Sequence, residues 1–168
     1  MIDMVNQVRR LQQSPLFQDW KERNVEAYLT HVFYMTDMEA QVGYYDPSQD
    51  KIVTFTMADV ITQNPPQQVF KKTDDPVKPL NVESIQLSSM RVIESAREFQ
   101  EKNFSAHSVI KEIIILQHLE EGQVYNVTFM TQAMSTLNMK FSAENGDLLS
   151  HQLKSVMDLG KKDQGAKQ

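Results

Sequence analysis

Short runs of alternating apolar and polar residues, each bounded by turn residues, constrain this fold more than any other feature. Residues 51–57, 125–129 and 137–141 alternate in this way, and successive side chains of a strand point to opposite faces. Turn sequences at 46–50 and 144–147 adjoin these runs, and the second contains Asn-Gly, a strong hairpin signal. Because strands joined by tight turns run antiparallel, the sequence predicts an antiparallel sheet.

Two further segments read as strands. Residues 27–35 are rich in aromatic and β-branched side chains, which favour strands. Residues 109–119 contain the run Ile113-Ile114-Ile115-Leu116, so the middle of this strand is apolar on both faces. A strand of that kind is typical of the centre of a sheet.

Three segments begin with residues that cap helices, namely Asp3, Ser14 followed by proline, and Ser88. After Ser88, helical spacing places three apolar residues on one stripe: Val92, Ala96 and Phe99. We predict that Phe99 is buried against Ile114 or its strand neighbours and against Val127 or Phe129, so that its truncation to alanine costs about 3–5 kcal/mol. The chain is therefore expected to be an α+β protein, with helix packed on antiparallel sheet.

The chain divides into two halves that share one order of elements. We assign residues 1–64 to a first α+β half, 65–81 to a proline-rich linker, 82–159 to a second half and 160–168 to a disordered tail. An ungapped offset of 82 residues places Phe17-Gln18-Asp19 on Phe99-Gln100-Glu101, and residues 28–34 on 110–116. The repeated order predicts an internal duplication with two similar halves.

The second half resembles the PepSY domain family. The resemblance covers residues 85–157 and rests on the segments 88–96, 124–129 and 139–149, the last reading Met-Lys-Phe-Ser-Ala-Glu-Asn-Gly-Asp-Leu-Leu. This sequence departs from the family pattern at Ser142, where aspartate is common, and at Asp147, where glutamate is common. The resemblance implies a helix packed on an antiparallel sheet in each of two similar halves. It also implies a non-catalytic role in inhibition or regulation, mostly in extracytoplasmic settings.

No catalytic or metal-binding signature is visible, so we expect no enzyme activity, no cofactor and no structural metal. The chain has no cysteine, and its four histidines form no paired ligand motif. Asp46, Ser48 and Asp50 copy the first spacings of a calcium loop, but Lys51 and Met57 occupy its glycine and bidentate-acid positions. His118 has Glu120 and Glu121 nearby, as a carboxylate–imidazole site would need, but we expect it to be a strand end beside a solvated turn. His31 is expected to be an ordinary sheet residue.

Charge and hydropathy exclude two kinds of partner. The net charge is −5 and no basic stripe is visible, so we expect no nucleic-acid binding. Neither a signal-peptide core nor a membrane-spanning apolar run is visible, so we predict no membrane insertion and a cytoplasmic location. The location would be extracytoplasmic if a signal segment had been removed.

We therefore predict a non-catalytic binding or regulatory module that takes a protein or peptide, with a homodimer as a further possibility. Its binding surface should be the open face or an edge of the sheet. The candidate binding residues are the polar side chains Asn126, Thr128, Asn138 and Lys140. The alternative is a small enzyme or ligand-binding protein with a cystatin-like or nuclear-transport-factor-like pocket between helix and sheet.

Overall fold

The computed structural model describes residues 2–69 and 76–157, so the predicted tail at 160–168 lies outside the described residues. Within those ranges the chain forms three α-helices and one sheet of nine strands, in which every pairing is antiparallel. The predicted α+β fold with an antiparallel sheet is confirmed. Across the described ranges, the structure contains no helix of the length and hydrophobicity that a membrane crossing requires.

The first half begins with two short helices, at the positions that the caps Asp3 and Ser14 predict. Its elements are α1 (Met4–Gln12), α2 (Pro15–Arg23), β1 (Tyr28–Met35), β2 (Gln41–Asp46), β3 (Lys51–Met57) and β4 (Ile61–Gln63). Strand β5 (Gln67–Gln68) lies within the segment predicted as a linker and pairs with β3. The second half begins with a short 3-10 helix, η1 (Val82–Ser84), and continues with α3 (Ser89–Asn103), β6 (Val109–Leu119), β7 (Gly122–Thr131), β8 (Ser135–Ser142) and β9 (Leu148–Ser155). The strand order is β4-β3-β2-β1-β6-β7-β8-β9, and β5 also pairs with β3.

Strands β1 and β6 join the two halves into one continuous sheet. The central pair of this seam is Phe33 with Ile115, two residues that are 82 positions apart. On either side, Val32 pairs with Leu116 and Tyr34 pairs with Ile114. The offset of 82 that the sequence analysis predicts for the two halves would therefore exchange the two sides of this seam, as a local two-fold axis would.

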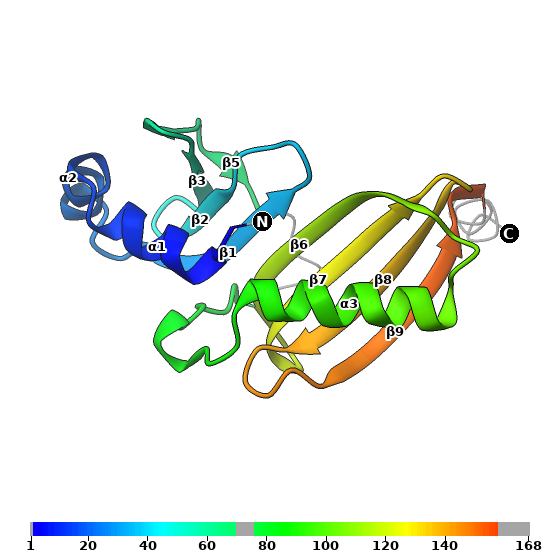
Figure 1. Ribbon diagram of the computed structural model, residues 1–168. Coiled ribbons are helices and arrows are strands. Elements are labelled where there is room, and N and C mark those ends of the chain that lie inside the picture. Colours follow the sequence, from blue (N-terminus) through cyan, green and yellow to red (C-terminus); the bar gives the residue numbers. More distant parts are fainter. Residues whose placement is uncertain (1, 70–75, 158–168) are drawn as a thin grey trace, which may run out of the picture.

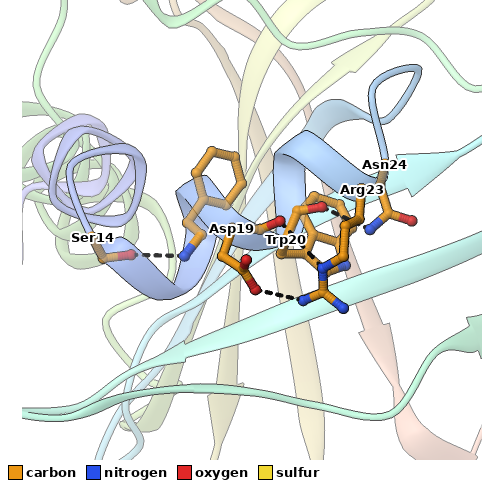
Figure 2. A network of polar contacts seen from close by, with 6 residues as sticks. Ser14, Asp19, Trp20, Arg23 and Asn24 are labelled. Atoms are coloured by element: carbon orange, nitrogen blue, oxygen red, sulfur yellow. Dashed lines mark hydrogen bonds and ion pairs between the residues drawn. The ribbon is translucent and has the colours of Figure 1, made fainter.

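The helices begin where the sequence predicts. The Asp3 carboxylate accepts a hydrogen bond from the Val5 amide at 3.1 Å, and the Ser88 hydroxyl accepts one from the Arg91 amide at 3.3 Å. Ser14 caps α2 by accepting from the Phe17 amide at 3.2 Å (Figure 2). These side chains satisfy backbone donors that have no partner within the helix.

Two further polar contacts lie on the outer surface of α2 and at its C-terminal end. Arg23 lies 2.7 Å from Asp19, one turn earlier, and the Asn24 side chain donates to the Trp20 carbonyl at 2.8 Å (Figure 2). The ion pair is exposed on both sides, so its contribution to stability is small. The role of α2 is instead to carry Phe17 and Trp20 into the core.

All three helices cover the same face of the sheet, as α1 and α3 do in front of the strands in Figure 1. The N-termini of α1 and α3 meet at the buried Ser89. Its hydroxyl accepts from the Met4 amide at 3.1 Å and donates to the Ile2 carbonyl at 2.9 Å. This contact and the β1–β6 seam both tie the first half to the second.

The core lies between the helices and the alternating apolar residues of the strands. In the first half, Phe17 and Trp20 pack their rings against Tyr44 and Phe55, with ring centroids 4.8–5.8 Å apart. In the second half, the predicted inward residues of β7 and β8 are all buried, namely Tyr125, Val127, Phe129, Leu137, Met139 and Phe141. The alternation in the sequence therefore gave the buried face correctly.

The prediction for Phe99 is wrong in detail. The buried stripe of α3 consists of Ser89, Val92, Ile93, Ala96 and Gln100. Phe99 is only partly buried, and its ring lies 4.9 Å from that of His151 on β9 and 6.0 Å from that of Phe104. Helical spacing fixes which residues share a stripe, but the placement of α3 on the sheet moves Phe99 toward the outer strand.

Candidate functional site

The face of the sheet opposite the helices has no helix covering it among the described elements, and it carries mixed side chains. Residues paired across antiparallel strands point to the same face. One such row crosses five strands and contains Gln41, Phe33, Ile115, Asn126 and Lys140. We call this side the helix-free face.

A pocket of about 670 Å³ opens on the helix-free face, at the seam between the halves. Its apolar lining residues are Phe33, Ile52, Val69 and Ile115, and its polar lining residues are His31, Gln41, Thr54, Gln67, Gln68 and Gln117. These residues come from β1, β2, β3, β5 and β6, and Val69 follows β5 directly. The volume falls within the range of natural ligand pockets, about 300–1,000 Å³.

The four predicted binding residues lie on the helix-free face, but beside this pocket rather than in it. The Asn138 side chain donates to the Asn126 side chain at 2.6 Å and to the Thr128 hydroxyl at 2.9 Å. The Lys140 ammonium lies 3.5 Å from a Glu121 carboxylate oxygen. Much of the hydrogen-bonding capacity of this cluster is therefore used within the protein.

His31 is the polar residue that the sequence reasoning missed. Its ring stands directly over Gly43, where a Cβ atom would lie only 2.1 Å from the ring carbon Cε1. Its Nδ1 atom lies 2.8 Å from the Thr30 hydroxyl, which donates to the Gly43 carbonyl at 3.2 Å. Gly43 thus provides the space that lets an imidazole lie in the floor of the pocket.

The fold has a solved counterpart. It is similar to the crystal structure of a protein described as a "putative lipoprotein" from Clostridium difficile 630, with a TM-score of 0.56 and 11% sequence identity. The alignment covers 86% of this chain and 97% of that chain. At this identity the likeness shows the fold alone. No protein-family model matches the chain, and no curated protein matches its sequence.

Burial lowers the pKa of His31 below its ordinary value near 6.5, because the charged imidazolium would lose hydration in the sheet floor. His31 therefore binds a proton less readily in the folded protein than in the unfolded chain. We expect the free energy of unfolding to decrease as the pH falls below about 6.5, until the lowered pKa of the folded state is passed. Urea unfolding of the wild type and of His31→Gln across this pH range measures the effect.

The other three histidines serve as the internal control, because they are identical in both proteins. The His31→Gln variant should lose that part of the pH dependence which the wild type owes to His31. Parallel pH profiles for the two proteins would contradict the assignment.

The other candidate sites offer fewer groups that could bind a ligand or a metal ion. In the described ranges, no three His, Asp or Glu side chains are grouped so that they could hold a metal ion. A second pocket, of about 360 Å³, lies on the helix side, and its lining includes Lys21, Tyr44 and Glu83. The Lys21 ammonium already donates to the carbonyls of Asn24 and Val25, so it points toward the end of its own helix.

Proposed function

We propose that this chain is a non-catalytic binding or regulatory protein of PepSY-like type, which holds a protein or peptide segment on its helix-free face. The observation that carries the proposal is the pocket at the seam, where Phe33 and Ile115 are only partly covered although both lie in central strands. An apolar patch left accessible on a soluble fold commonly marks an interaction site.

The PepSY-like assignment rests on two observations. Each half has helix followed by antiparallel strands, and the quoted segments of the second half form α3, β7 and the β8–β9 hairpin. The assignment itself stays a prediction. So does the cytoplasmic location, which gains no support from a neighbour described as a "putative lipoprotein".

Selection from a phage-displayed library of random peptides tests the proposed function. The whole folded chain is the bait, and enriched peptides are then measured against two matched variants on the same strand. Ile115→Lys places a charge in the pocket, whereas Ile110→Lys changes a half-exposed residue outside the pocket lining. We expect peptide binding to be lost in the first variant and retained in the second.

Far-UV circular dichroism must show that both variants are folded. If Ile115→Lys does not fold, the milder replacement Ile115→Gln is used in its place. Failure to enrich any peptide would contradict the proposal. So would peptides whose binding is unaffected by every change at Ile115. Binding lost equally in the Ile110→Lys variant would place the ligand elsewhere on β6.

A further inference from the structure

The described lining of the pocket at the seam carries no formal charge. None of its described lining residues is Asp, Glu, Lys or Arg, and burial favours the neutral form of His31. A charged group that entered would lose hydration without gaining an opposite charge, which is unfavourable. The lining therefore selects against ionic ligands.

The glutamine side chains of the lining are available for a ligand. Four glutamine side chains line the pocket, at positions 41, 67, 68 and 117. Across the described residues, no hydrogen bond engages any of these four side-chain amides. Each amide offers both a donor and an acceptor, as a peptide group does. The apolar residues between them can take uncharged side chains, so the lining complements a neutral polypeptide segment.

The Thr30 hydroxyl bears on which ring nitrogen of His31 carries the proton. It lies 3.2 Å from the Gly43 carbonyl oxygen and 2.8 Å from His31 Nδ1, and it has one proton to donate. When that proton goes to the Gly43 carbonyl, which can only accept, the hydroxyl oxygen accepts from a protonated Nδ1, and this is the arrangement we infer. Nε2 of the neutral ring is consequently an acceptor.

Nε2 of His31 is a ring nitrogen that a ligand in the pocket can engage. It has no hydrogen-bond partner among the described residues. His31 is one of the residues that line the pocket, so a donor group of a ligand there can supply the missing partner.

We propose that the pocket holds an uncharged, extended peptide segment of a partner protein, and that Nε2 of His31 accepts a hydrogen bond from one of its N–H or O–H groups. This inference rests on the proposed function and specifies its ligand. Strand β5 supports this proposal. One edge of β5 pairs with β3, and no other described strand pairs with its opposite edge. Such an edge provides backbone groups that an extended peptide can pair with.

The first test measures the free protein. Long-range ¹H–¹⁵N NMR of the imidazole at neutral pH should show His31 with its proton on Nδ1. A proton on Nε2 would overturn the acceptor role, whether or not any peptide binds. This readout needs no variant and so does not depend on the folding of one.

The second test uses a capped peptide enriched in the selection described above. His31→Phe keeps a ring but removes the acceptor, and should weaken peptide binding about two- to tenfold, as expected for one hydrogen bond. His151→Phe, on the exposed outer strand, should leave the affinity unchanged. Affinity should also change less than about twofold between low and high salt, because no ion pair is involved.

The outcomes separate the two proposals. If no peptide is enriched, the proposed function fails and this inference fails with it. Only the inference is overturned if peptides bind through Ile115 but are charged and bind with salt-dependent affinity. The same holds if their affinity does not change in His31→Phe. A dimer that dissociates on Ile115→Lys replacement would show that a second copy occupies the face, and this also overturns the inference.

Discussion

Replacing Phe129 with alanine should lower the free energy of unfolding by about 3–5 kcal/mol, the range for truncating a fully buried phenylalanine. Phe129 has no exposed surface. It lies on β7 between Glu112 of β6 and Leu137 of β8, on the face that α3 covers. Its removal leaves a cavity that rigid strands on both sides cannot close. Urea unfolding followed by far-UV circular dichroism measures the change.

Phe99→Ala is the matched control, since it makes the same chemical change in the same half of the protein. Phe99 is only partly buried, and it packs near the outer strand against His151 and Phe104. The loss should therefore be clearly smaller than for Phe129→Ala. An equal or larger loss would mean that α3 sits over the sheet differently from the arrangement described above.

Replacing Phe55 with alanine should cost a similar amount, about 3–5 kcal/mol, in the first half. Phe55 is fully buried, and its ring centroid lies 5.2 Å from Trp20 and 5.7 Å from Phe17. Trp20 is the single tryptophan of the chain, so its fluorescence reports on this half alone. The fluorescence and circular dichroism midpoints should move together, because β1–β6 pairing makes one continuous sheet.

Val60→Ala provides the control, because Val60 is 75% exposed and its truncation should change stability by less than about 0.5 kcal/mol. The reciprocal measurement uses Phe129→Ala, whose change in the second half should move the Trp20 transition as well. If the unfolding midpoint measured by Trp20 fluorescence did not change in Phe129→Ala, the two halves would unfold independently, and the seam would not couple them.

Local features of the sequence determined most elements of the fold. The predicted strands at 51–57 and 109–119 match β3 and β6 residue for residue. Asp3, Ser14 and Ser88 each cap the helix that was expected of them. These predictions succeeded because capping, alternation and turn formation depend on residues within a few positions of one another.

The sequence also indicated which face of the sheet would stay open, but not where on it a pocket would form. The residues Asn126, Thr128, Asn138 and Lys140 do lie on the helix-free face. Polarity pointed to them, yet their side chains largely bond within the protein. The apolar character of Ile113 and Ile115 on the helix-free side of β6 was the signal closest to the pocket.

Only the tertiary structure decided the site itself, because its parts are distant in the chain. Pairing of β1 with β6 brings Phe33 beside Ile115, and no local propensity specifies that two strands so far apart become neighbours. The same pairing network sets His31 opposite Gly43 across β1 and β2, where the missing side chain leaves room for the ring. The sequence therefore determined the strands, the caps and the buried face, whereas long-range pairing created the pocket and gave His31 its place in it.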